Sequence, residues 1–120
     1  MLPARHRLRD RRDFAIAVRG RRVGNRLVVV HAARPDARAD QPARIGLAVS
    51  RAVGNAVVRN RAKRVLRARL AAMMPSIPPG TDLVVRAQPQ LRRATGDEVD
   101  AALESALRRA VAAVGCSRER

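Results

Sequence analysis

A basic helix is the feature that most constrains the fold of this chain. Residues 55–73 contain neither Gly nor Pro, and within them an apolar stripe separates from a set of cations at the 100° helical spacing. The stripe consists of Val58, Ala62, Val65 and Leu66. The side chains opposite or beside it are Arg59, Asn60, Lys63, Arg64 and Arg67. Any fold of this chain therefore has to bury the stripe and leave the cations at the surface.

Local signals fix the limits of this helix and indicate what it faces. Asn55 can cap the N-terminus, and prolines follow shortly after residue 73. Arg61 and Arg69 lie beside the apolar stripe and are expected to extend their guanidinium groups to solvent. Like charges at i,i+4 spacing repel by about 0.2–0.5 kcal/mol per pair, and no acid occurs between Asp40 and Asp82. The helix is therefore predicted to face an external polyanion.

The composition of the whole chain supports a nucleic-acid partner. It carries 26 Lys and Arg against 10 Asp and Glu, for a net charge of +16, and all but Lys63 of these cations are Arg. Arginine favours bidentate contacts with phosphate and stacking on bases. A membrane partner is not predicted, because the chain has one Phe, no Trp and no apolar run near the about 20 residues that span a bilayer. A single cysteine and a start without a signal-peptide core predict a cytoplasmic protein.

The remaining pattern predicts one α+β domain over residues 1–120. Residues 1–9 are expected to form a basic extended arm, and residues 10–19 a helix that Asp10 caps and Gly20 closes. Strands are predicted at residues 26–33, or as two strands across 23–33, and at 44–50 and 82–87. Thr95 and Glu98 form a capping box for a final helix, before a flexible tail at 115–120. The basic helix then lies in a strand–helix–strand crossover.

Protein-based catalysis is poorly supported by the sequence. His6 and His31 have no Cys or acid at ligand spacing, and no Asp-x-Asp or paired-carboxylate pattern occurs. Asp97, Glu98 and Asp100 cluster at a helix N-terminus, where stabilisation of the helix dipole explains them. No catalytic residue and no metal ligand is predicted. A folded RNA- or DNA-binding protein fits best, either a ribosomal-type RNA-binding protein or, last, a nucleoid-type DNA-binding protein.

Two consecutive segments resemble a known family. Residues 49–57 read Val-Ser-Arg-Ala-Val-Gly-Asn-Ala-Val, and residues 59–67 read Arg-Asn-Arg-Ala-Lys-Arg-Val-Leu-Arg. The bacterial ribonuclease P protein subunit carries V-S-[KR]-x-V-G-N-A-V followed by R-N-R-x-K-R-x-x-R. Further similarity covers residues 7–9, 13–14, 20–22, 44–46 and 82–85, in order. The resemblance thus extends over nearly the whole chain.

The resemblance implies an α/β sandwich. It has three helices, a central, mostly antiparallel sheet of about four strands, and a left-handed β-α-β crossover. It also implies a subunit whose partner RNA is the catalyst. That RNA removes the 5′ leader of precursor tRNA with Mg²⁺ ions that are held mainly by the RNA. No obligate protein partner is predicted. The residues expected to bind the catalytic RNA are Arg51, Arg59, Asn60, Arg61, Lys63, Arg64 and Arg67.

The resemblance also implies a leader-binding cleft between the first helix and the sheet. Its expected residues are Phe14, Val18, His31, Arg7 and Arg9. Aromatic side chains usually line this cleft, and here Val18 and His31 stand at two of those positions. Leader binding is therefore expected to depend more on cations than on stacking. The alternative role for Phe14 is that of a core residue on an amphipathic helix.

Overall fold

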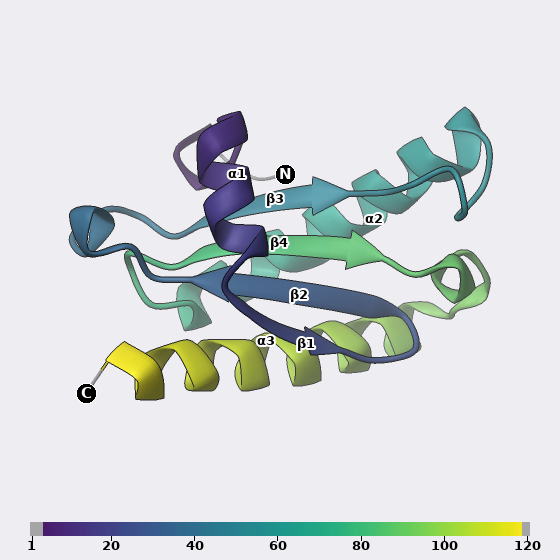
Figure 1. Cartoon of the computed structure of the whole chain (residues 1–120). Helices are drawn as coiled ribbons and strands as arrows, with labels where there is room; N and C mark the ends of the chain where they lie inside the picture. Colours follow the sequence, from purple (N-terminus) through teal and green to yellow (C-terminus); the bar gives the residue numbers. More distant parts are fainter. Residues whose placement is uncertain (1–3, 119–120) are drawn as a thin grey trace.

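The computed structural model describes residues 4–118 and has the predicted α+β composition (Figure 1). Its helices are α1 (Arg11–Val18), α2 (Ala56–Met73) and α3 (Gly96–Arg118). Its strands are β1 (Arg21–Gly24), β2 (Val28–Ala33), β3 (Arg44–Ala48) and β4 (Asp82–Ala87). Short 3-10 turns are η1 (Ala4–His6), η2 (Asp36–Arg38), η3 (Met74–Ser76) and η4 (Pro89–Arg93). Within the described residues, no helix is both long and apolar enough to cross a membrane.

Side-chain caps begin all three helices where the sequence predicts them. The Asp10 carboxylate accepts a hydrogen bond from the Arg12 backbone N–H at 2.8 Å, and Asn55 Oδ1 accepts one from Val58 N–H at 3.0 Å. Thr95 and Glu98 form the full capping box, with distances of 2.8 and 3.2 Å. Each cap satisfies a backbone donor that has no partner inside its helix. The predicted starts of the helices are therefore confirmed.

The sheet has the order β1-β2-β4-β3 and is mixed. β2 pairs antiparallel with both β1 and β4, whereas β3 and β4 are parallel. The chain passes from β3 through α2, which lies behind the sheet in Figure 1, and returns in β4. In Figure 1 both strands point to the right, with β3 above β4 and α2 behind them, so the β3-α2-β4 connection is a left-handed crossover. Right-handed connections are the rule for parallel strands, so this expected crossover is an unusual feature of the fold.

Two local predictions are decided by the structure. Of the two alternatives for residues 23–33, the one with two strands is confirmed: a turn at Asn25, whose Oδ1 accepts from Leu27 and Val28 N–H at 3.0 Å each, separates β1 from β2, which begins at Val28. Gly20 follows α1 as expected, but it does not adopt the left-handed conformation of a typical C′ glycine. A Cβ at Gly20 would lie 2.0 Å from the Ala32 carbonyl oxygen. Close approach to β2 therefore explains this glycine.

The two faces of the sheet have different covers. α2 and α3 lie on one face, where Val28, Val30, Leu66, Leu83 and Leu103 belong to the main core. α1 lies on the opposite face, which we call the α1 face (Figure 1). Because side chains alternate along a strand and directly paired residues share a face, the register places the following residues on the α1 face. They are Arg22, Val29, His31, Gly46, Ala48, Val84 and Arg86.

The ends of the described chain are more ordered than predicted. The predicted extended arm contains the 3-10 turn η1, after which Arg7 forms a parallel bridge with Ile45 and Leu8 N–H donates to the Ile45 carbonyl at 3.0 Å. His6 Nδ1 lies 2.7 Å from the Ala43 carbonyl oxygen. The backbone of the predicted tail is helical as far as Arg118. The rest of the predicted arm and tail, at residues 1–3 and 119–120, lies outside the described residues.

Candidate nucleic-acid interface

The outward side of α2 carries the predicted RNA-binding cations. Ala62, Leu66 and Leu70 are buried against the core, and Val58 and Val65 pack at its margin. The resulting orientation exposes Asn60, Arg61, Arg64 and Arg67, and leaves Arg59 and Lys63 half-buried. We call this set, together with the exposed Arg51, the α2 cation face. The helical-wheel prediction is thus confirmed for the buried stripe and for the outward position of Arg64.

The charges on the α2 cation face have no internal neutralisation. Among the described side chains of residues 4–114, the ion pairs involve other cations, and none joins a carboxylate to residues 51–67. The Nε atom of Arg59 is buried without a hydrogen-bond partner. Repulsion along the helix is relieved only by solvent and counterions, so a polyanion gains from binding here by releasing them.

The turn before α2 holds Arg51 beside the start of this helix. Backbone hydrogen bonds close the turn, from Val53 N–H to the Ser50 carbonyl at 3.1 Å and from Gly54 N–H to the Arg51 carbonyl at 3.2 Å. A Cβ at Gly54 would lie 2.7 Å from the Val58 side chain, so glycine allows the chain to turn tightly into the helix. The motif residues before the Arg-Asn-Arg segment therefore shape the backbone, and Arg51 adds a cation at its edge.

The α1 face brings together three of the residues predicted for the leader cleft, Phe14, Val18 and His31. Phe14 covers Gly46 so closely that a Cβ there would lie 2.5 Å from the ring. Leu8, Ala17 and Val84 are buried beside it. Phe14 is half-buried, so its ring serves both as core and as accessible surface. Val18 on the same helix is 37% exposed.

His31 lies on the α1 face, yet it does not present its ring to solvent. It is only 4% exposed, which leaves little of the ring for stacking on a base. Neither ring nitrogen makes a hydrogen bond of good geometry, although the Val18 backbone lies near enough to favour the protonated form. Burial and the nearby Arg86 outweigh that contact and lower the pKa of His31, with a smaller contribution from Arg22. His31 is therefore neutral at pH 7 and forms a wall of this surface.

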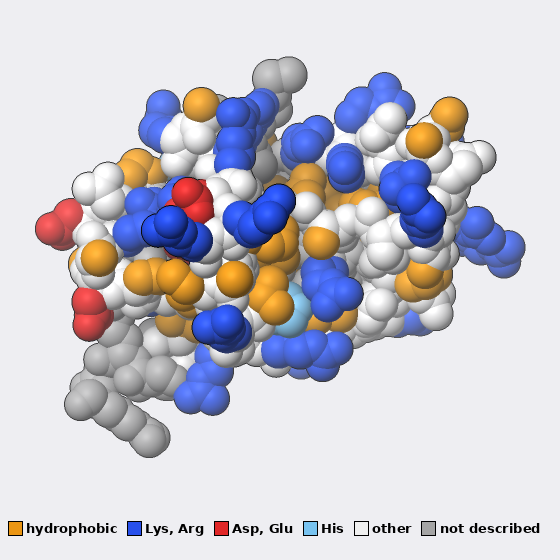
Figure 2. Space-filling view, turned by 45° about the horizontal axis from the view of Figure 1, so that its top comes forward, with side chains coloured by type: hydrophobic (Ala, Val, Ile, Leu, Met, Phe, Trp, Pro, Cys, Tyr) orange, Lys and Arg blue, Asp and Glu red, His pale blue; other side chains and the backbone are white. Residues whose placement is uncertain are grey.

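Arg22 and Arg86 are surface cations that the sequence analysis did not single out. His31 pairs with Arg22 across β1 and with Val84 across β4, and Arg86 follows two residues later on the same face. Both arginines are exposed, as is the predicted Arg9, whereas Arg7 is half-buried beside β3. Figure 2 shows Lys and Arg side chains distributed over this side of the molecule between apolar ones, with the visible carboxylates gathered at the left. Only strand pairing reveals this grouping.

A buried ion network fixes α1 over the sheet. Arg44 donates to both oxygens of Asp82, from Nε at 2.9 Å and from Nη2 at 2.7 Å, and its Nη1 donates to Asp13 at 3.0 Å. Arg38 Nε lies 3.6 Å from Asp82. The Asp82 hydrogen bonds raise the pKa of Arg44, so the cation is permanent. Because Asp13 precedes Phe14, this network sets the position of the ring on the α1 face.

The acids at the start of α3 do not fit a metal site. Glu98 caps Thr95 and lies 3.5 Å from Arg26, and Asp100 accepts a hydrogen bond from Arg69. The backbone and side chain of Thr95 lower the pKa of Glu98, as expected for a capping carboxylate. Among the side chains that the structure describes, those of residues 4–114, no three His, Cys, Asp or Glu come together as metal ligands would. The carboxylates here serve the helix and its ion pairs.

Comparisons with known proteins agree with the resemblance in the sequence. The family model described as Ribonuclease P matches residues 2–111. A ribonuclease P protein component from a Nocardioides species is 48% identical over 115 residues, which cover 95% of this chain and 98% of that protein. The Staphylococcus aureus RNase P protein structure has a TM-score of 0.77 at 29% identity, covering 88% of this chain and 94% of that one. The Thermotoga maritima RNase P protein gives 0.74 at 32% identity, covering 88% and 97%.

Proposed function

Since this chain belongs to the ribonuclease P protein family, we propose that the α2 cation face binds the catalytic RNA and that the α1 face holds the 5′ leader of precursor tRNA. As a ribonuclease P protein component, the chain is part of an endoribonuclease in which the RNA carries the chemistry. A ribosomal-type structural role is not favoured, because the similarity covers the whole fold as well as the basic helix.

The observation that carries the proposal is the concentration of cations on α2 without carboxylate partners among the described residues. The packed side of α2 holds the helix rigid, so the cations keep a fixed spacing along it. Guanidinium groups at fixed spacing suit the phosphates of a structured RNA. Binding of the catalytic RNA on this face would leave the α1 face, on the opposite side of the sheet, free to bind the leader of the precursor tRNA.

The α1 face has the features that a single-stranded leader requires. Phe14 and Val18 offer apolar surface, and Arg9, Arg22 and Arg86 offer cations around it. A single strand needs apolar or aromatic surface for its bases and cations for its backbone. His31 contributes shape here more than stacking, since it is nearly buried. We place the Mg²⁺ ions of the reaction on the RNA, and the complex in the cytoplasm.

The test is 5′ processing of a precursor tRNA by a bacterial catalytic RNA at low Mg²⁺, with and without this chain. Cleavage is expected only when both are present, and the chain alone is expected to leave the precursor intact. Tight binding to the RNA without any rescue of cleavage would contradict the proposal and favour a structural RNA-binding role. Cleavage by the purified chain alone would overturn it.

A further inference from the structure

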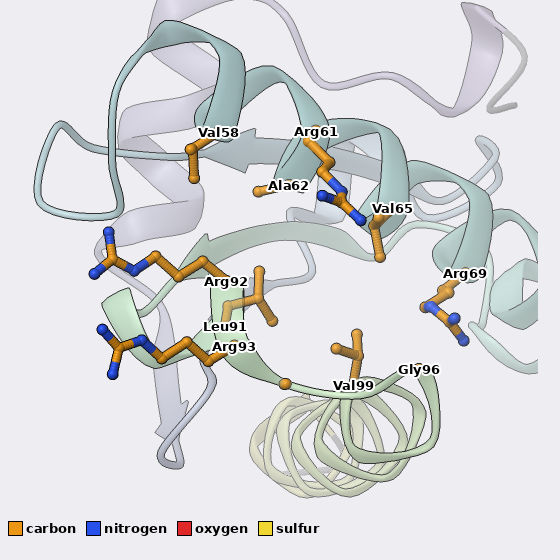
Figure 3. A pocket seen from close by; sticks show the side chains of 11 residues that line it. Val58, Arg61, Ala62, Val65, Arg69, Leu91, Arg92, Arg93, Gly96 and Val99 are labelled. Carbon is orange, nitrogen blue, oxygen red and sulfur yellow. The ribbon is translucent and has the colours of Figure 1, made fainter.

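A groove adjoins the α2 cation face and shares Arg61 with it, but its other residues have no role in the functions described above. It lies between α2 on one side and η4 with the start of α3 on the other (Figure 3), and its volume is about 460 Å³. That volume falls within the range of about 300–1,000 Å³ usual for ligand-binding sites. The residues that line it are Val58, Arg61, Ala62, Val65, Arg69, Leu91, Arg92, Arg93, Ala94, Gly96 and Val99.

The middle of the groove is apolar and comes from both sides. In Figure 3, Val58, Ala62 and Val65 point from α2 toward Leu91 and Val99, which point back from η4 and α3. Leu91 and Val99 are buried at 5% and 3% exposure, so the floor is anchored in the core. The flat, weakly polar faces of a nucleobase are suited to such a floor.

Cations mark the ends of the groove, and no carboxylate lines it. At one end, Arg69 is held by Asp100 and would lie 2.6 Å from a Cβ at Gly96, so its guanidinium is tightly placed. At the other end, Arg92 and Arg93 extend side by side in the same direction (Figure 3). Arg92 Nη1 donates to the Val53 carbonyl at 3.5 Å, which ties this end to the turn before α2. Arg61 spans the side nearest to the α2 cation face.

We propose that this groove binds one unstacked nucleotide of the catalytic RNA, with its base on the apolar floor and its flanking phosphates on Arg61, Arg92 and Arg93. Continuity with the α2 cation face, the proposed surface for the catalytic RNA, selects RNA over an acidic peptide here, because Arg61 belongs to both. Unstacked bases that stack on aromatic side chains or guanidinium planes are a general mode of RNA recognition, and here aliphatic side chains take the place of the aromatic ones. The inference rests on the proposed function and adds a base contact to it.

Two pairs of matched variants test the groove in the full chain bound to a bacterial catalytic RNA. R92A/R93A removes the two cations at the open end, and R108A/R109A removes two adjacent, equally exposed arginines on α3 outside the groove. Ala94→Leu fills the groove, and Ala72→Leu makes the same change at an exposed position of α2 outside it. Thermal melting identifies any variant that fails to fold.

The groove variants are expected to differ from their controls in two measurements. R92A/R93A should lower the slope of log affinity against log salt by about 1.4–1.8, or about 0.7–0.9 for each lost phosphate contact, and R108A/R109A should change it much less. Ala94→Leu should weaken binding about tenfold, which corresponds to about 1.4 kcal/mol. Dimethyl sulfate probing should show a base of the RNA that the wild type and Ala72→Leu protect and Ala94→Leu leaves reactive.

The outcomes separate this inference from the proposed function. If the wild-type chain supports cleavage and the groove variants match their controls in salt slope and base protection, the nucleotide site is overturned while the proposed function stands. If the wild-type chain neither binds the catalytic RNA nor supports cleavage, both are overturned. A loss of affinity without a change in base protection would also contradict the site, because it would reduce the groove to phosphate contacts.

Discussion

The α2 cation face and the α1 face are both surfaces for RNA in our proposal, but they are built in opposite ways. The first is a single helix whose cations follow from one local periodicity. The second combines α1 with all four strands, and it depends on a buried ion network between Arg44, Asp82 and Asp13. Substitutions on the α2 cation face should therefore change RNA binding and spare the fold, whereas substitutions on the α1 face should affect both.

The largest expected effect is on stability, from the loss of Asp82 in the ion network of the α1 face. Asp82→Ala leaves Arg44 without its bidentate partner in a site where Asp82 is 1% exposed. Removal of one member of a buried pair costs about 3–5 kcal/mol, so the free energy of unfolding should fall by that order. Urea denaturation measures this. Asp40→Ala, at an exposed acid, is the control, and equal stability of the two variants would show that the network does not support the fold.

A smaller effect, on binding of precursor tRNA, is expected from Phe14→Ala. This variant tests whether the Phe14 ring belongs to the binding surface or only to the core. Loss of the ring over Gly46 should weaken binding of precursor tRNA with a leader by about 1–3 kcal/mol, the contribution of one stacked base, and leave mature tRNA binding unchanged. Binding of the two RNAs to the holoenzyme measures the difference. Equal losses for both RNAs would assign Phe14 to the core alone.

Arg64→Ala tests the claim that the α2 cation face is separate from the fold. Arg64 is exposed and has no carboxylate partner among the described ion pairs, so the melting temperature should stay nearly constant. Affinity for the catalytic RNA should fall, and its salt dependence should lose about one unit of slope. Arg109→Ala, an exposed arginine on α3, serves as the control. A lower melting temperature for Arg64→Ala would show that the α2 cation face also supports the fold.

The smallest effect concerns pH and the buried His31. Its folded pKa lies below its ordinary value because of burial and Arg86, so the unfolded chain binds more protons below about pH 6.5. Stability should therefore be retained above that pH and fall as the pH drops toward the folded pKa. Denaturation of the wild type and His31→Phe at pH 7 and 5.5 gives the comparison. The variant should lose less stability between the two pH values, and an equal loss would show that His31 does not titrate with unfolding.

Local signals explain how much of this fold could be predicted. The three helix starts follow from caps at Asp10, Asn55 and Thr95, each of which acts within three residues along the chain. The turn at Asn25 between β1 and β2 could be predicted only as an alternative, since its Nδ2 also donates to the Ala102 carbonyl at 3.1 Å, a contact 77 residues away. Gly20 was predicted as the residue that closes the first helix, but the need for glycine comes from the close approach of Ala32, which is also distant in the chain.

In the candidate site, too, features set by local spacing could be predicted and features set by long-range contacts could not. The orientation of Arg64 and Arg67 on α2 could be predicted because neighbours on a helix surface are set by the 3.6-residue repeat. The grouping of Arg22 and Arg86 around His31 could not, because it requires the order and register of three strands. The burial of His31 was likewise hidden, since α1 covers the sheet only in the folded protein.

The sequence by itself determined the helices, the outward charge of α2 and the need for a polyanionic partner, because these depend on spacing along one element and on composition. The left-handed crossover and a cleft under the first helix were expected from the family resemblance, but only the tertiary structure decided the ion network of the α1 face, its Arg22 and Arg86 cations, and the groove between α2 and η4. Each of these joins segments that are distant in the chain, and their contacts are set by strand pairing and packing rather than by local propensity.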